Sequence, residues 1–300
     1  MLSVDDAVDR LSGGGVVAVP TETVYGLAAD GLRAQSVARI FAAKGRPADN
    51  PLILHVAGVE QAWPLWRVSE RERDRALRLA SLWPGPLTMV LPSAEHVPAV
   101  VRAGLDTVAV RAPDHPVAQA ILAGFGGPLA APSANASGRP SPTTAAHVLR
   151  DLGDRIDGVV DGGACTVGVE STVVDLRGPM PRVLRPGSVS RERLEAALGE
   201  PVTAYEPGFV AGSPGLRHVH YRPDVASVRA LTDADAQWSG PDALVVFAST
   251  AGRMVARYGA RTAPIAVLPD APDAAMRSKS SPPDMSSSTM KMSGGSHEQP

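Results

Sequence analysis

The sequence predicts an α/β domain over residues 1–200 of the 300, with a twisted, mixed sheet and flanking helices. Short apolar, β-branched segments alternate with longer segments whose apolar residues recur every three or four positions, as strands and helices do. Several of the strands are separated only by turns, so we expect antiparallel as well as parallel pairs. A hydrophobic content of 44% and a charged content of 20% are typical of a globular body.

The first half of this domain begins with a strand at 16–19, which follows three glycines. A helix is predicted over 34–43, because its apolar residues share one helical face. A buried strand follows at 52–56. A charged amphipathic helix at 70–82 ends before Pro84, since proline does not continue a helix.

The second half repeats the alternation with shorter elements. Apolar runs between glycine and proline signals predict the strands, and amphipathic spacing predicts the helices. The predicted strands are 87–91, 107–110, 129–131, 159–160 and 171–176, and the predicted helices are 116–123, 143–149 and 191–198.

Beyond the domain the composition changes twice. Glycine and proline punctuate residues 201–223, which predicts a linker. Residues 271–300 are rich in serine and predict a low-complexity, disordered tail. Between them, residues 224–270 are too short for a full second domain and predict a partial Rossmann-like fragment. That fragment has strands at 243–247 and 265–268 around a helix at 253–258.

Composition excludes several classes of protein. The net charge is −2, so the chain is no wholesale polycation, and the single cysteine, Cys165, excludes a disulfide framework and a cysteine-built zinc site. No apolar run reaches the length of a membrane span, and the aspartate-rich start is not a signal peptide, so we expect a cytoplasmic protein with no membrane contact. No phosphate-binding GxxxxGK[ST] loop and no dinucleotide fingerprint is present.

Lys44 and Arg46 stand two apart at the end of a predicted helix. Lys44 is the only lysine in the first 278 residues, although arginine is common. Together the two cations can converge on one anion, with arginine as a fork and lysine as a point charge. The alternative is a pair of cations that complement the dipole at the helix C-terminus.

Hydroxyl and amide side chains follow two predicted strands. Thr21 and Thr23 come directly after the first strand, and Ser133 and Asn135 lie in a loop after the apolar run at 129–131. Such groups suit a small polar ligand. The alternative for the second pair is a turn that caps the next helix.

Together, in this order, the motifs resemble those of the threonylcarbamoyl-AMP synthase family, whose core is the YrdC-like domain. The resemblance spans nearly all of residues 5–200, and the linker SPGLRHVHYRP (213–223) is similar to that of the long, two-domain branch. The matching motifs are PTETVYGL (20–27), KGRP (44–47), NPLILH (50–55), PGPLT (84–88), PSANASG (132–138), SPT (141–143), ESTVVD (170–175) and RPG (185–187).

This resemblance implies an ATP-dependent nucleotidyltransferase that serves tRNA modification. L-Threonine captures CO2 or bicarbonate as a carbamate, whose oxygen attacks the α-phosphate of ATP, and pyrophosphate leaves. A separate transferase complex then moves the threonylcarbamoyl group of the product, threonylcarbamoyl-AMP, to adenosine 37 of tRNA. Because the threonine carboxylate, the carbamate and the triphosphate are all anionic, we expect cations and hydrogen-bond donors in the site, and magnesium on the phosphates.

The resemblance also implies the roles of particular residues. Lys44, Arg46, Ser133 and Asn135 form the catalytic centre. L-Threonine is held by Thr23, His55, Arg111, Ala131 and Ser171. ATP is held by Arg46, Asn50, Thr107, Ser133, Ser141 and Arg185, and by Tyr221, which reaches back from the linker as part of a lid.

Two alternatives from other classes stay open at this point. The same cations could hold RNA phosphates, which would make the chain an RNA-binding module, although an aromatic content of 4% disfavours base stacking. A carbamoyl-transfer module of a larger maturation enzyme would need cysteine-rich zinc fingers, which one cysteine excludes. For a synthase, a weak contact with RNA is a further expectation.

Overall fold

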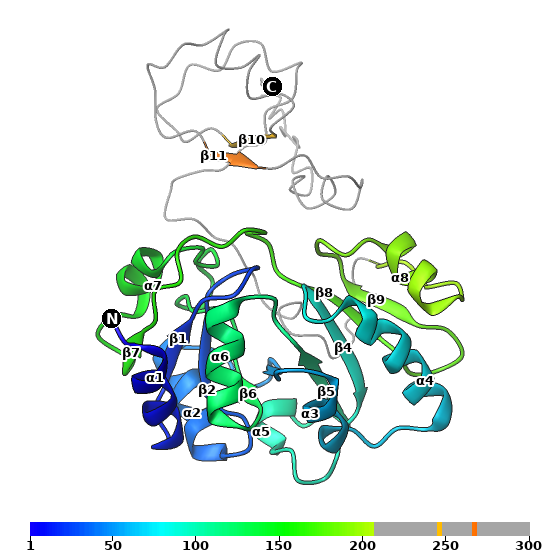
Figure 1. Ribbon diagram of the computed structural model, residues 1–300, viewed down its shortest axis with the longest axis horizontal. Coiled ribbons are helices and arrows are strands. Elements are labelled where there is room, and N and C mark those ends of the chain that lie inside the picture. The colour runs from blue at the N-terminus through cyan, green and yellow to red at the C-terminus, as the bar shows by residue number, and fades with distance from the viewer. Residues whose placement is uncertain (207–244, 248–265, 269–300) are drawn as a thin grey trace, which may run out of the picture. The chain divides into compact units, whose positions relative to one another are not determined.

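The computed structural model describes residues 1–206, 245–247 and 266–268 (Figure 1). The chain divides into two units, Met1–Asp224 and Val225–Pro300. In the second unit β10 (Val245–Phe247) and β11 (Ala266–Leu268) pair in parallel, in agreement with the two predicted strands. The predicted helix at 253–258, linker residues 207–223 and the tail at 271–300 lie outside the described residues.

The first unit is built on a mixed nine-stranded sheet of order β7-β1-β2-β6-β3-β5-β4-β8-β9 (Figure 1). The pairs β1/β7, β3/β5 and β4/β8 are parallel and the others are antiparallel, so the predicted fold class is confirmed. The strands are β1 (Val17–Val19), β2 (Gly26–Asp30), β3 (Ile53–His55), β4 (Leu87–Pro92), β5 (Thr107–Arg111), β6 (Leu129–Ala130), β7 (Gly158–Val159), β8 (Thr172–Asp175) and β9 (Arg182–Arg185).

Helices connect and cover these strands, and each predicted helix of the first unit is present. Two helices of this unit begin with a capping box. The side chains of Ser3 and Ser69 each accept a hydrogen bond from the backbone N–H three residues later, and a carboxylate side chain from that residue accepts one from the serine backbone N–H. No described helix is long and apolar enough to cross a membrane. The helices are α1 (Val4–Ser12), α2 (Ala34–Lys44), α3 (Val59–Ala62), α4 (Glu70–Leu79), α5 (Ala99–Arg102), α6 (Pro116–Phe125), α7 (Ala145–Leu152) and α8 (Arg191–Leu198), with 3-10 turns at Trp63–Leu65 and Ala80–Leu82.

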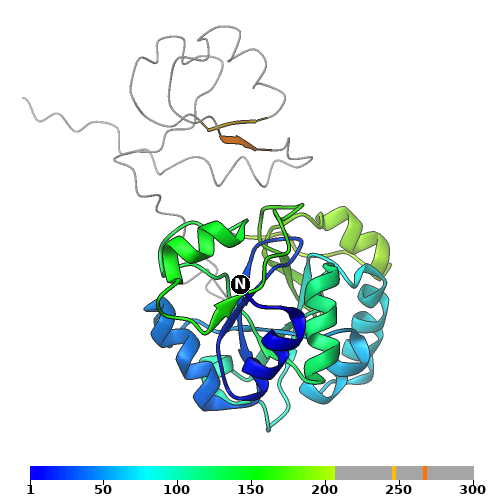
Figure 2. The same ribbon diagram turned by 60° about the vertical axis from the view of Figure 1, so that its left-hand side comes forward.

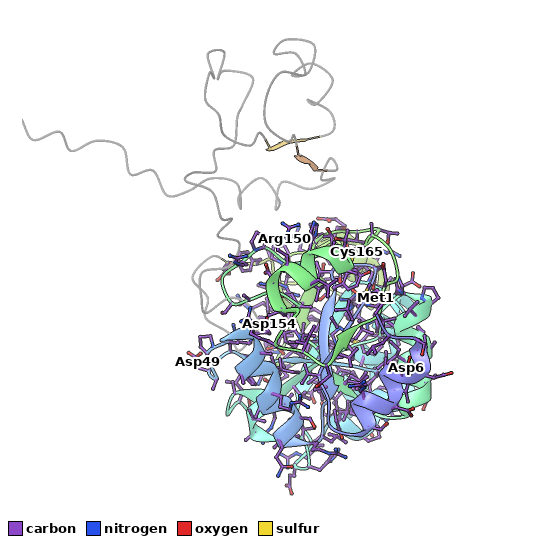
Figure 3. The ribbon with its side chains drawn as sticks, turned by 90° about the vertical axis from the view of Figure 1, so that its left-hand side faces the viewer. Met1, Asp6, Asp49, Arg150, Asp154 and Cys165 are labelled. Atoms are coloured by element: carbon purple, nitrogen blue, oxygen red, sulfur yellow. The ribbon has the colours of Figure 1, made fainter. Side chains whose placement is uncertain are left out.

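The two faces of the sheet are covered differently. One face packs along its whole width into the main core, against α2, α4, α7 and α8. On the other face, α1 and α6 are the described helices that cover the sheet, and within residues 1–206 they cover only the half built from β7, β1, β2 and β6 (Figure 2). Figure 3, which labels Asp6 on α1 and Asp154 after α7, views this covered half from its edge.

The remaining half of that face carries a small separate apolar cluster from β3, β4, β5, β8 and β9. Because side chains alternate across a strand, the polar residues that flank this cluster on the same strands stand on the same face. The uncovered half of the sheet is therefore the surface on which a site can form. The cluster consists of Ile53, Val90, Ala109, Val173 and Leu184.

A buried arginine fastens α4 to the far end of the sheet. Arg75, on α4, is 2% exposed. Its Nε and Nη2 donate to the two carboxylate oxygens of Glu200, at 2.6 and 2.8 Å. Its Nη1 donates to the carbonyls of Leu176 and Gly178, and its Nη2 also donates to that of Pro179. All five N–H groups of Arg75 are therefore used, so its desolvation is compensated.

Candidate functional site

The uncovered face gathers three polar side chains at one end of its strands. β3 and β5 run in parallel and align His55 with Arg111, and β4 runs antiparallel and aligns Thr88 with Arg111. All three residues are buried. The register therefore brings together two of the residues expected to hold the amino acid.

Arg111 is the centre of this end of the site. Its Nη1 donates to Thr23 Oγ1 at 2.8 Å, and its Nε donates to the carbonyl of Gly85 at 3.2 Å. Its Nη2 lies 2.6 Å from Glu22 Oε1. Burial lowers the pKa of Arg111 below its ordinary value, and the Glu22 carboxylate opposes that shift. Because an arginine guanidinium does not lose its proton in proteins, we expect Arg111 to stay charged at neutral pH.

His55 is a neutral imidazole beside this cation. Burial, followed by the charge of Arg111, lowers the pKa of His55 to about 3. Thr21 and Ala131 lie close by, and with His55 they line an apolar cavity of about 20 Å³ between the sheet and α6. Ala131, directly after β6, is held by a bond from its N–H to the carbonyl of Ile53.

Ser171 joins β8 and β9 to the same site. Its hydroxyl lies 2.7 Å from that of Thr88 on β4. Arg185, on β9, donates to the carbonyl of Ser171 from Nε and to its hydroxyl from Nη2, both at 3.1 Å. Thr88 was not among the residues expected from the sequence, although it ends the quoted PGPLT motif, and the strand register is what places it here.

Lys44 points into the loop that carries Ser133 and Asn135. Its Nζ donates to the carbonyl of Asn135 at 2.6 Å and to that of Ser133. Ser137 returns a bond from its N–H to the carbonyl of Lys44. Burial, and then the neighbouring charge of Arg46, lower the pKa of Lys44 well below its ordinary value. Lys44 is therefore buried and is not a solvated cation at a helix end. Its bonds to main-chain carbonyls of the loop hold that loop in place.

The amide of Asn135 is turned into the same loop. Its Nδ2 donates to the carbonyls of Ala136 and Arg139, at 2.9 and 2.7 Å. Its Oδ1 is buried and has no hydrogen-bond partner. A buried acceptor without a hydrogen bond costs free energy, and a donor group on a bound ligand would remove that cost.

Arg46 connects this loop to the other end of the sheet face. It donates to the carbonyls of Asn50 and Pro51, the latter at 3.0 Å. Burial and the charge of Arg185 lower the pKa of Arg46 to about 10. Thr107 is buried at the start of β5, at the opposite end of the strand from Arg111, and pairs with Pro92 on β4.

Two predicted ATP-binding residues remain, and the structure describes the first of them, Ser141. The Ser141 hydroxyl donates to Glu170 Oε1 at 2.7 Å, and Glu170 directly precedes Ser171 in the chain. Tyr221 and the lid to which it was assigned lie outside the described residues. Across residues 1–206, no group of three or more histidine, cysteine, aspartate or glutamate side chains could hold a metal ion.

The fold and the site define a class: an α/β domain whose mixed sheet gathers buried arginines and hydroxyl groups beside a small apolar cluster on one face. The Sua5/YciO/YrdC family model, described as "Telomere recombination", matches residues 9–187. The chain belongs to this family, and the resemblance seen in the sequence is confirmed.

Three curated relatives are named threonylcarbamoyl-AMP synthase. The threonylcarbamoyl-AMP synthase of Pyrococcus abyssi is 48% identical over 214 residues, which cover 70% of this chain and 62% of the relative. That of Bacillus subtilis is 46% identical over 213 residues, 69% and 61% of the two chains. That of Vibrio cholerae is 39% identical over 160 residues, 53% and 85%. The chain therefore spans about three fifths of the length of the first two.

Solved structures agree with the fold. P. abyssi Sua5 complexed with L-threonine superposes with a TM-score of 0.70 at 40% identity, over 85% of this chain and 72% of that one. E. coli YciO superposes with a TM-score of 0.57 at 22% identity, over 64% and 92%, which supports the fold alone.

Proposed function

We propose that the chain is a threonylcarbamoyl-AMP synthase, a nucleotidyltransferase that converts L-threonine, CO2 or bicarbonate and ATP into threonylcarbamoyl-AMP and pyrophosphate. The observation that carries this proposal is the arrangement of cations on the uncovered sheet face. Arg111 stands at one end of β5, and Arg46 lies at the other end beside Asn50 and Pro51. An amino acid and a triphosphate can thus bind side by side over the small apolar cluster of this face.

The amino acid binds at the Arg111 end. Arg111 pairs with its carboxylate, as a guanidinium suits a carboxylate in two bonds. Thr23, Ser171 and neutral His55 supply hydrogen-bonding groups for the remaining polar atoms, and Ala131 lines the wall. The likeness to a relative solved with L-threonine supports this end of the site.

The nucleotide binds at the Arg46 end. Arg46 and Arg185 neutralise phosphate charge, and Ser133, Asn135 and Asn50 contribute polar groups. Lys44 fixes the loop of Ser133 and Asn135 through its carbonyls. Thr107, Ser141 and Tyr221 complete the predicted ATP set.

Chemistry then follows from position and charge. The carbamate oxygen attacks the α-phosphorus, the bond to the β-phosphate oxygen breaks, and pyrophosphate leaves with both electrons. The cations stabilise the charge that develops on the phosphates. Magnesium fits this scheme as an ion that arrives on the phosphates, because the nearby carboxylates form no metal cage. When bound, it would add charge neutralisation.

The cellular role is part of the same proposal. The product passes to a transferase complex that modifies adenosine 37 of tRNA, in the cytoplasm. The linker at 201–223 acts as a lid over the nucleotide, and residues 224–270 form a partial second domain.

Isotope exchange between pyrophosphate and ATP tests the proposed function. The purified chain should catalyse exchange only when L-threonine and bicarbonate are both present, and omission of either is the control. Exchange that is absent, or independent of threonine, would contradict the proposal. Salt-sensitive binding of RNA without exchange would support the alternative of an RNA-binding module instead.

A further inference from the structure

One carboxylate of the site has acceptor capacity that nothing fills. Glu22 is 5% exposed, and its Oε1 is held in an ion pair 2.6 Å from Arg111 Nη2. Its Oε2 has no hydrogen-bond partner among the residues that the structure describes. A carboxylate offers about four lone-pair positions. Glu22 is therefore a buried anion that is paired in charge and unfilled as an acceptor.

Among the described residues, no other buried carboxylate oxygen is without a hydrogen-bond partner. Both oxygens of Glu200 accept bonds from Arg75, and Glu170 accepts a bond from Ser141. The only thiol near Glu22, that of Cys165, has its pKa raised to about 11 by burial, so it brings no charge of its own at neutral pH. An unsatisfied buried carboxylate is destabilising, and its presence next to the substrate-binding arginine indicates a ligand that completes it.

The charge of the expected ligand supplies what is missing. An amino acid is a zwitterion, and the residues assigned to it so far offer one cation and several hydroxyls but no anion. We propose that Glu22 binds the ammonium group of the amino-acid substrate while Arg111 binds its carboxylate. This inference rests on the proposed function, and it makes the Arg111–Glu22 pair a recognition unit for a zwitterion.

The same placement serves the first chemical step. The ammonium group must lose a proton before its nitrogen can attack carbon. Glu22 accepts that proton, the nitrogen lone pair forms a bond to the carbon of CO2, and the electrons of one C=O bond move to oxygen to give the carbamate. The nitrogen loses a second proton to solvent water as the carbamate forms, and Glu22 keeps the first. Glu22 then touches the reacting nitrogen directly.

Calorimetry with two ligands on the full chain tests the assignment. The ligands are L-threonine and its α-hydroxy analogue, which keeps the carboxylate, the hydroxyl and the methyl group but lacks the ammonium. We expect Glu22→Gln to weaken L-threonine binding by about 10- to 100-fold, the range for a hydrogen bond to a charged group, and to leave the analogue's affinity unchanged or higher. Glu95→Gln, which removes an exposed carboxylate paired only with Arg67, should change neither affinity.

The outcomes separate this inference from the proposed function. Equal weakening of both ligands would overturn it, because Glu22 would then act only by orienting Arg111. If Glu22→Gln does not fold, Glu22→Asp keeps the charge and retracts the carboxylate, and it must show the same selective loss. A wild-type protein that binds neither ligand would contradict the proposed function itself. A wild-type protein that binds L-threonine, with a variant that binds it equally well, would contradict only the role of Glu22.

Discussion

Replacement of Lys44 by methionine should separate two roles that a lysine can have in this site. The sequence predicts a cation on the phosphates of ATP. The structure directs two of the three N–H bonds of Lys44 to the carbonyls of Ser133 and Asn135. Lys44→Met keeps most of the side-chain volume and removes both bonds. If those bonds are what matters, the loop loses its position and every ligand group that the loop binds is affected.

The expected size follows from the two bonds. Each contributes about 1 kcal/mol if the amine is neutral and about 1.5–3 kcal/mol if it is charged, so their loss lowers the free energy of unfolding by about 2–6 kcal/mol. Removal of a fully buried amine offsets several kcal/mol of this, because its desolvation penalty disappears. We expect a net loss below about 3 kcal/mol in stability. We expect a rate of pyrophosphate formation that falls on the order of 100-fold or more.

Binding of AMP and ATP to the variant distinguishes the two roles. If Lys44 acts by holding the loop, Lys44→Met weakens both nucleotides by the same factor. If it contacts the β- and γ-phosphates, ATP weakens and AMP does not, and that result would refute the loop-positioning argument. Urea denaturation confirms that the variant is folded, and Lys291→Met controls for the loss of a lysine elsewhere in the chain.

Four further predictions concern the domain and its site. Arg75→Met should lower the free energy of unfolding by about 3–5 kcal/mol in urea denaturation, because the carbonyls of three residues lose their donor and Glu200 is left with the more distant Arg71. Arg75 lowers the pKa of Glu200, so wild-type stability should fall as pH drops through that lowered pKa, and less so in Glu200→Gln. His55, with a pKa of about 3, should show no imidazole titration by NMR between about pH 5 and 8. In the unfolded chain the same imidazole takes up a proton near its ordinary pKa. The free energy of unfolding should therefore fall as the pH drops below about 6.5. Valine should turn over far more slowly than L-threonine in the exchange assay, since the hydroxyls of Thr23 and Ser171 lose their partner; equal rates would contradict this site.

Much of the fold could be predicted from local pattern, because most elements bury one face and end at glycine or proline. The helix at 191–198 has the same bounds in the structure, and the strand at 107–110 differs by one residue. Five elements were missed, of which α3 and α5 are helices of only four residues. α1 is polar at its start, β2 continues a motif that was interpreted only as a binding loop, and β9 carries arginine at both ends. In each, tertiary pairing overrides a weak local signal.

The sequence predicted which residues gather at the candidate site better than it predicted their contacts. Motif order placed Thr23, His55 and Arg111 in one set, and the register of β3, β5 and the Thr23 turn brings them together. Sequence alone does not show that a long side chain turns inward, so the bonds of Lys44 to a loop about 90 residues away could not be foreseen. Glu22 lies within the quoted motif PTETVYGL, but the state of its carboxylate oxygens is a property of the packed structure.

The length of β5 fits the proposal that one sheet face binds two ligands. Thr107 and Arg111 are four residues apart on the same face, which at the rise of a strand is about 13 Å. Between them Ala109 is apolar, and its neighbours Ile53 and Val90 are also buried. A short side chain at 109 leaves room above the floor, and an apolar floor keeps competing water away from the carbamate. The strand thus sets the spacing of the two anion-binding ends, and a larger side chain at Ala109 should obstruct the junction between the substrates while both ends remain intact.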